Sequence, residues 1–365
     1  MDSSINNDKK RGKKIVVTGG AGYLGSILTP QLLKEGHQVH VIDKLYFGKG
    51  SLTPHESNSN LKITELDMFH HENISNLFKG VDAVIHLASI SNDPSGDLDP
   101  NLTIQTNFLA TMSLARRAKA EGVKQFIFIS SCSVYGASGD TFLDEQSNVG
   151  PVTLYALSKL QSENELLPLA DSNFSVTILR FATLFGYSPR MRFDLAVNVM
   201  TKRALQGKSI LLNGDGAQYR PFLHVKDASK AIMTVLNEDA CIVNKQIFNV
   251  GNSHLNFMIR DLVPLIHSYF PQSVIEKVEN NKDTRSYRVN FRKFERICNF
   301  KAECDVEHGV REIENAHKSA ELANMDSPQY YNMEVMKKVI SEPIITYSLA
   351  TTPRWSNGQG DHNGL

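Results

Sequence analysis

The chain has 365 residues, of which 41% are apolar and 21% charged, and this is enough for one large or two modest globular domains. Lysine plus arginine and aspartate plus glutamate both number 39, so no net charge draws the protein to nucleic acid or to an anionic membrane. No run reaches the roughly 18 apolar residues that a membrane span requires, and residues 1–13 lack the apolar core of a signal peptide. We therefore expect neither a nucleic-acid nor a membrane partner.

The four cysteines are scattered along the chain without C-x-x-C spacing, at Cys132, Cys241, Cys298 and Cys304. This spacing argues against a disulfide framework and against a zinc site. It predicts a protein of the reducing cytoplasm that holds no metal.

A short apolar run at residues 14–18 predicts a strand buried on both faces, and a glycine-rich turn follows it. Gly20, Gly22 and Gly25 satisfy G-x-G-x-x-G, and Gly19 also begins a G-x-x-G-x-x-G spacing. Such a turn lets the backbone approach a pyrophosphate at the N-terminus of a helix, and an amphipathic helical pattern begins here.

Asp43 ends the next apolar run, where a carboxylate accepts hydrogen bonds from an adenosine ribose. A 2′-phosphate would be repelled there, so NAD is favoured over NADP, although Lys44 beside it weakens this preference. The alternative is an ordinary glycine-rich turn followed by a solvated aspartate. The strand before the turn, the helix after it and the acid together favour a dinucleotide site.

Apolar runs at residues 61–67, 81–88 and 124–131 predict further strands, and they alternate with helical patterns such as 103–121. This alternation indicates βαβ units and a parallel sheet. The acidic, breaker-rich loop 89–100 cannot continue a strand and is a candidate lining of a substrate pocket.

Tyr155 and Lys159 lie four residues apart and share one face of a predicted helix. A tyrosine has a pKa near 10, so it acts as a base near neutrality only beside a cation, which Lys159 supplies. A hydroxyl from the end of the strand at 124–131 would hold the substrate oxygen in line. The pair is common on helices, but its place after a dinucleotide fingerprint and a serine-rich strand end favours catalysis.

Several longer motifs stand in this order along the chain: TGGAGYLGS, DAVIHLA, ISSCSVYG, YALSK, LRFATLFG, RPFLHVKD and RSYRVNFRK. With them the chain resembles the extended short-chain dehydrogenase/reductases that act on nucleotide sugars, over about residues 14–322. The resemblance implies an α/β fold, a Rossmann-type doubly wound parallel sheet with a smaller, mostly C-terminal α/β substrate-binding lobe.

The resemblance also implies a division of the chain. Residues 14–186 would form the NAD-binding domain, to which 222–250 return, and the substrate-binding lobe would comprise 187–221 and 251–330. Residues 1–13 are expected to be disordered, and 331–365 to be a C-terminal extension with a flexible tail.

For the reaction, the resemblance implies that Tyr155 is the general base, that Ser131 binds the reacting hydroxyl, and that Lys159 anchors the nicotinamide ribose and lowers the tyrosine pKa. Asp67 and Met68 would flank the adenine, although Asp67 is almost as well suited to cap a helix. The full set of expected NAD-binding residues is Gly19, Gly22, Tyr23, Leu24, Gly25, Asp43, Asp67, Met68, Leu87, Ala88, Asn107, Tyr155, Lys159 and Phe181.

On the substrate side, the resemblance implies that Arg220 clamps a diphosphate, for which the guanidinium fork is suited; the alternative is a surface ion pair. Asn198 and Arg285 fall where the family contacts nucleotide or phosphate. Arg190 and Arg192 flank a methionine in an extended segment, so they face one way and are predicted to converge on one anion.

The departures from the family pattern are also informative. Members that dehydrate sugars carry Asp-Glu directly after the catalytic residue, where this chain has Cys132 and Ser133, so dehydration is not expected. Members that invert C3 and C5 use a cysteine at the position of Ser133, which argues against double epimerisation unless the loop shifts by one residue. Ser133 and Thr183, where many relatives have asparagine, are therefore expected to shape the substrate pocket.

The leading hypothesis is an NAD-dependent epimerase that inverts C4 of a nucleotide-linked hexose through a transient 4-keto sugar. The same residues would serve a net C4 dehydrogenase or reductase. A non-catalytic sensor of NAD or nucleotide sugar is less consistent with an intact Ser131, Tyr155 and Lys159. The segment SPRMRFDL resembles enzymes of bacterial surface-polysaccharide pathways, and the family resemblance implies a homodimer that pairs the helices at 103 and 155.

Overall fold

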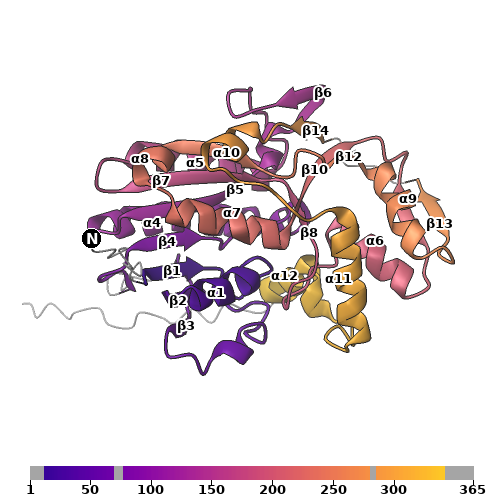
Figure 1. Cartoon of the computed structure of the whole chain (residues 1–365), viewed down its shortest axis with the longest axis horizontal. Helices are drawn as coiled ribbons and strands as arrows, with labels where there is room; N and C mark the ends of the chain where they lie inside the picture. The colour runs from indigo at the N-terminus through magenta and orange to yellow at the C-terminus, as the bar shows by residue number, and fades with distance from the viewer. Residues whose placement is uncertain (1–11, 70–76, 280–284, 342–365) are drawn as a thin grey trace, which may run out of the picture.

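The computed structural model describes residues 12–69, 77–279 and 285–341. A seven-stranded parallel sheet lies at its centre, with strand order β3-β2-β1-β4-β5-β7-β11 (Figure 1). The strands are β1 (Lys14–Thr18), β2 (Gln38–Asp43), β3 (Leu61–Glu65), β4 (Ala83–His86), β5 (Gln125–Ser131), β7 (Ser175–Phe181) and β11 (Gln246–Val250). The chain order reverses beside β1, and ligands collect at such switch points beyond the carboxyl ends of parallel strands.

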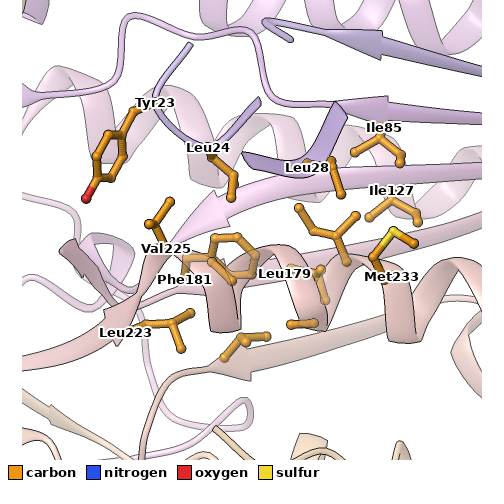
Figure 2. Packing of buried hydrophobic residues seen from close by; sticks show 14 of the residues in the cluster. Tyr23, Leu24, Leu28, Ile85, Ile127, Leu179, Phe181, Leu223, Val225 and Met233 are labelled. Atoms are coloured by element: carbon orange, nitrogen blue, oxygen red, sulfur yellow. The ribbon is translucent and has the colours of Figure 1, made fainter. Parts of the chain in front are cut away.

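Helices cover both faces of this sheet, because alternate strand residues point to opposite sides. On one face, Val17 of β1 packs with Leu28 of α1 (Gly25–Lys34) and Met233 of α7 (Val225–Asn237). On the other, Val16 packs with Leu114 of α4 (Ala110–Ala120), and α5 (Leu154–Leu166) lies beside α4. Figure 2 shows the first of these clusters between α1, α7 and the sheet. The predicted doubly wound parallel sheet is confirmed.

The helix predicted at 103–121 is interrupted. It consists of α3 (Pro100–Ile104), the π-helical turn η3 (Gln105–Leu109) and α4. The widened turn releases the carbonyl oxygen of Asn107, which accepts hydrogen bonds from the hydroxyls of Thr111 (2.8 Å) and Ser162 (3.0 Å). Helical periodicity in the sequence could not predict this interruption, because it depends on side chains from another helix.

A smaller lobe lies beyond the carboxyl ends of the central strands, at the right of Figure 1. Its three small sheets have strand orders β12-β10-β8, β13-β9 and β14-β6. The strands are β6 (Ala137–Leu143), β8 (Thr183–Phe185), β9 (Ile210–Asn213), β10 (Tyr219–His224), β12 (Asn256–Met258), β13 (Ile275–Val278) and β14 (Ser286–Val289).

The helices of this lobe pack around Phe185 and Phe222. They are α6 (Ala196–Leu205), α9 (Ile259–Tyr269) and α11 (Val306–Lys318), and the last described helix is α12 (Asn332–Ser341). Among the described residues, no helix has both the length and the hydropathy of a membrane span. Most of the disordered N-terminus predicted at 1–13, and the tail predicted within 331–365, fall outside the described residues.

Candidate active site

A cavity of about 570 Å³ opens between the carboxyl ends of the central strands and the smaller lobe. It brings together side chains and backbone from segments far apart in the sequence. Among the residues predicted for the site, those that line it are Gly19, Gly22, Tyr23, Leu24, Gly25, Asp43, Asp67, Met68, Leu87, Ala88, Ser131, Ser133, Tyr155, Lys159, Phe181, Thr183, Arg190, Arg192, Arg220 and Arg285.

The glycine-rich turn between β1 and α1 has no room for side chains. Gly19 adopts a φ of +71°, and a Cβ there would lie 2.7 Å from the amide nitrogen of Ala88. A Cβ on Gly25 would lie 2.5 Å from the carbonyl oxygen of Gly19. The backbone at the start of α1 is thus bare and open to the cavity, as the binding of a pyrophosphate requires.

Asp43 is held in a fixed orientation at the end of β2. Its two carboxylate oxygens accept hydrogen bonds from the backbone N–H groups of Ala21 (3.0 Å) and Leu45 (2.8 Å). Burial raises the pKa of Asp43, and these two hydrogen bonds act in the opposite direction. The neighbouring Lys44 ammonium lies 3.4 Å from the carboxylate of Asp67. An oriented carboxylate whose lysine neighbour is already paired suits the ribose hydroxyls of NAD.

Ser131 and Tyr155 meet at the inner end of the cavity. Ser131 is the last residue of β5, and Tyr155 lies in the first turn of α5, which Thr153 caps by accepting from Ala156 N–H (3.2 Å). Burial and the Asp93 carboxylate raise the pKa of Tyr155, and a hydrogen bond with Ser131 opposes them only in part, so the net shift is upward.

Lys159 lies one helical turn after Tyr155, and its ammonium is 5.9 Å from the centroid of the tyrosine ring. Its Nζ donates a hydrogen bond to the carbonyl oxygen of Ile129 (2.9 Å). Burial lowers the pKa of Lys159 to about 7, against the opposing effect of Glu163. This geometry does not support the prediction that Lys159 lowers the pKa of Tyr155, because the Lys159 ammonium is directed at β5.

Two predicted contact residues lie behind the cavity wall. Asn107 is buried, and its amide group bonds both the N–H (2.8 Å) and the carbonyl (3.1 Å) of Ile90. Asn198 accepts from Gly186 N–H (2.9 Å) and donates to the Tyr23 hydroxyl (3.2 Å). Both predictions of direct contact need correction, because these amides hold the loops and side chains that form the wall.

Arg190 and Arg192 both act electrostatically on Asp194, but their direct contacts differ. Arg192 forms a bidentate pair with Asp194, at 3.0 and 2.6 Å. Arg190 lies over the ring of Phe47, 3.7 Å from its centroid, and its charge acts on Asp43. The alternation of side chains correctly placed both cations on the cavity, but it could not reveal that each has its own partner. Arg190 therefore lies within reach of the charges of both Asp194 and Asp43.

Arg220 is only 6% exposed, so it is not a surface residue. Its Nη1 donates to the carbonyl oxygens of Tyr219 (2.8 Å) and Arg285, and its guanidinium lies 5.1 Å from the centroid of the Tyr287 ring. The Arg285 guanidinium pairs with Asp93. The Oγ of Ser133 is buried without a hydrogen-bond partner among the described residues, although it lines the cavity. This hydroxyl is available to a ligand.

Comparison with known proteins decides the family. The profile of the NAD dependent epimerase/dehydratase family matches residues 15–251. The chain is 30% identical to the UDP-N-acetyl-alpha-D-glucosaminuronate decarboxylase of Bacillus cytotoxicus over 315 residues, covering 82% of this chain and 96% of the relative. The chain belongs to the NAD dependent epimerase/dehydratase family. It is therefore an enzyme whose cofactor is NAD.

Solved structures agree with this membership in the epimerase/dehydratase family. The UDP-N-acetylglucosamine 4-epimerase from Methanobrevibacter ruminantium M1, in complex with UDP-N-acetylmuramic acid, superposes with a TM-score of 0.76 at 26% identity. MoeE5 in complex with UDP-glucuronic acid and NAD gives 0.73 at 25% identity. Both comparisons cover 84% of this chain and 99% of the other. The glycine cradle and the oriented Asp43 fit the cofactor that the family uses.

This family member also has site residues that the sequence did not reveal. They include Asp93, Asp194 and Tyr287, together with Asn332, Met333 and Met336 of α12. Asp93 lies in the acidic loop that was predicted to line a pocket, so its loop was foreseen but its role was not. Nothing in the sequence of α12 marked it as part of a site, because an amphipathic helix carries no motif.

One buried histidine and one cluster of histidines and a cysteine have structural explanations. His86 is fully buried and bonds the hydroxyls of Thr18 (2.6 Å) and Thr111 (2.8 Å), and burial lowers its pKa to about 3. Such a histidine stays neutral and is part of the core.

The second cluster brings ligand atoms of His224, Cys304 and His308 within 4.8 Å of one another. The Nδ1 of His224 accepts a hydrogen bond from the N–H of Lys226 (3.2 Å), which places the histidine proton on Nε2, the atom that would have to bind a metal. Glu312 lies 2.9 Å from that Nε2 and also pairs with the Lys226 ammonium. Glu312 thus ties α11 to the start of α7 through its ion pair with Lys226 and its contact with His224.

Proposed function

We propose that this enzyme inverts the configuration at C4 of a hexose linked to a nucleoside diphosphate. The observation that carries the proposal is the meeting of Ser131, Tyr155 and Lys159 at the inner end of a cavity with NAD-binding geometry at one end and arginines at the other. The family's chemistry at nucleotide sugars and the 4-epimerase similarity support it.

Each residue has a defined part in this reaction. Ser131 holds the sugar hydroxyl in line, and Tyr155 takes the hydroxyl proton as the C4–H bond breaks. NAD, held by the glycine-rich turn and Asp43, would supply the hydride acceptor for C4. The keto sugar would have to turn in the cavity before a hydride reaches its other face. Lys159 binds the ribose hydroxyls of the cofactor, and Arg220 faces the diphosphate end of the substrate. Reprotonation of the oxygen by Tyr155 then restores the site.

The charges around the cavity favour a neutral hexose over a uronate. Arg192 is paired with Asp194 and Arg285 with Asp93, so a sugar carboxylate would compete with protein carboxylates for both cations. Asp93 also raises the pKa of Tyr155, which locates its negative charge close to the reacting oxygen. A substrate carboxylate nearby would add repulsion.

A second candidate is oxidation at C4 followed by decarboxylation of a nucleotide-linked uronate. It is supported by the 30% identity to a decarboxylase, and the cavity is lined by several cations, Arg285 among them. This reaction uses the same Ser131, Tyr155 and Lys159, so the nature of the sugar decides between the two candidates.

The test incubates the purified protein, without added cofactor, with UDP-, GDP-, dTDP- and CDP-hexoses and with UDP-glucuronate. Product NMR and absorbance at 340 nm are followed together. C4 inversion over many turnovers without accumulated NADH would support the epimerase. Release of CO₂ with a pentose product would support the decarboxylase in place of the epimerase. Stoichiometric NADH with no further product would indicate a dehydrogenase.

A further inference from the structure

The C-terminal strap, defined here as residues 326–341, forms part of the wall of the cavity. It comprises Asp326, the turn through Tyr330 and Tyr331, and α12. Asn332, Met333 and Met336 of α12 line the same cavity as the glycine-rich turn and Asp43. Figure 1 shows α12 in yellow at the junction between the sheet and the smaller lobe.

The strap is anchored to the substrate-binding lobe at its beginning. Lys202 of α6 donates hydrogen bonds to the carboxylate of Asp326 (2.5 Å) and to the hydroxyl of Tyr331. The N–H of Phe193 donates to the carbonyl of Tyr330 (3.0 Å), and the two rings meet edge to face with centroids 5.8 Å apart. These contacts fix the direction in which α12 leaves the lobe.

Asn332 then joins the two sides of the cavity. Its Oδ1 accepts a hydrogen bond from Nη2 of Arg190 (2.6 Å), and its Nδ2 donates to the Oγ of Ser91 (3.1 Å). Arg190 acts electrostatically on Asp43, at the adenosine end, whereas Ser91 follows β4. Asn332 is 3% exposed, so this bridge is buried.

One hydrogen-bond donor on this bridge indicates that a ligand binds beside it. The Nε of Arg190 is buried and has no hydrogen-bond partner among the described residues, although its Nη2 is engaged by Asn332. A buried guanidinium N–H without an acceptor costs free energy unless something accepts from it. A dinucleotide that lies between Asp43 and the loop after β4 would bring phosphate and ribose oxygens to this region.

We propose that the C-terminal strap is an additional wall of the NAD site and keeps the dinucleotide bound between turnovers. This inference rests on the proposed function, because an epimerase must return the hydride to the substrate from which it came. The resemblance traced in the sequence ends at about residue 322, ahead of the strap. Asn332 orients Arg190 toward the dinucleotide, while Met333 and Met336 cover the cavity with apolar surface.

The test uses Asn332→Ala and Met333→Ala, with Glu334→Ala as the matched control. Glu334 lies on the same helix but is exposed, and its carboxylate pairs with Lys337. NAD bound to each purified protein is measured by chromatography of the released nucleotide, and its dissociation rate is measured by exchange with labelled NAD. We expect both site variants to release NAD about tenfold faster, since one charge-assisted hydrogen bond or the contact of one methionine that lines the cavity is lost. The control should match the unmodified protein.

Unchanged dissociation in both folded site variants would overturn the proposal, and so would equal acceleration in Glu334→Ala. Thermal melting in the presence of saturating NAD checks that each variant is folded. Because the readout uses no nucleotide sugar, its result is separate from that of the substrate screen. If the protein epimerises no hexose but Asn332→Ala accelerates the release of NAD, the proposal for the strap stands and the proposed reaction is wrong.

Discussion

Burial acts on the two central residues of the site in opposite directions. It raises the pKa of Tyr155 and lowers that of Lys159, so the protein alone favours a neutral phenol beside an amine that titrates near neutrality. The chemistry needs a phenolate and an ammonium. The positive charge of oxidised nicotinamide is a further source of stabilisation for the phenolate.

We expect Tyr155→Phe to lower kcat at least 100-fold, because a positioned general base contributes about 10²–10⁴. NAD should remain bound, since the phenyl ring keeps the shape of the wall. Steady-state turnover with the best nucleotide hexose and the NAD content of the purified variant are the two measurements. Turnover equal to that of the unmodified protein would mean that another group is the base.

The lowered pKa of Lys159, about 7, predicts a pH dependence of NAD binding. If the ammonium is the form that holds the ribose hydroxyls, affinity is fully present below pH 7 and is lost as pH rises, because each unit above the pKa lowers the protonated fraction tenfold. We expect the dissociation constant of cofactor-stripped protein to be about tenfold higher at pH 8 than at pH 6. Calorimetric titration measures it, and Lys159→Met should remove the slope.

At the scale of elements, α5 is fixed to the sheet by a buried ion pair. Glu163 of α5 accepts two hydrogen bonds from Arg180 of β7, from Nη2 (2.6 Å) and Nε (3.0 Å), and another from Ser130 of β5. Arg180 also donates to the hydroxyl of Tyr135 (3.0 Å). This network sets the position of the helix that carries Tyr155 relative to the strand that carries Ser131.

Glu163→Ala should therefore destabilise the protein by about 3–5 kcal/mol, because it leaves the Arg180 charge buried and unpaired. Urea unfolding followed by circular dichroism gives the free energy of unfolding. Glu165→Ala, an exposed neighbour on the same helix, is the control and should change it by less than about 0.5 kcal/mol. Similar stability for both variants would show that the pair contributes little to the position of α5.

The sequence predicted the elements of this fold better than their contacts. Apolar runs and glycines were enough for the strands around β1, because a parallel sheet buried on both faces demands continuous apolar runs. The π-helical turn at Asn107 and the partners of Arg190 and Arg192 were missed. Both depend on groups far away in the chain, the hydroxyl of Ser162 in one case and the ring of Phe47 and the carboxylate of Asp194 in the other. Local pattern fixes the face on which a side chain lies but not what it meets there.

At the scale of the whole molecule, large apolar side chains are exposed on the helices at one side of the sheet. Leu109 of η3 is 43% exposed and Leu157 of α5 is 41% exposed, with Ile104 of α3 nearby. These are the helices predicted to pair in a homodimer, and burial of such side chains against a second copy would remove them from water.

We expect the protein to sediment as a dimer and Leu157→Glu to shift it toward the monomer, because the charge would be buried without a partner. Analytical ultracentrifugation over a range of concentrations measures this. Val274→Glu, at an exposed apolar residue of the smaller lobe, is the control. A monomer at all concentrations in the unmodified protein would exclude the predicted pairing.

The position of α12 at the end of the described chain has a consequence for biosynthesis. A chain emerges from the ribosome with its N-terminal part first, and domains fold as they emerge. The strands of the central sheet and the glycine cradle are complete by residue 250, whereas α12 follows some eighty residues later. On this order of synthesis, the nucleotide would enter while its site is still open on that side, and α12 would then close over it. The cofactor content of each molecule would be set largely when that molecule is made.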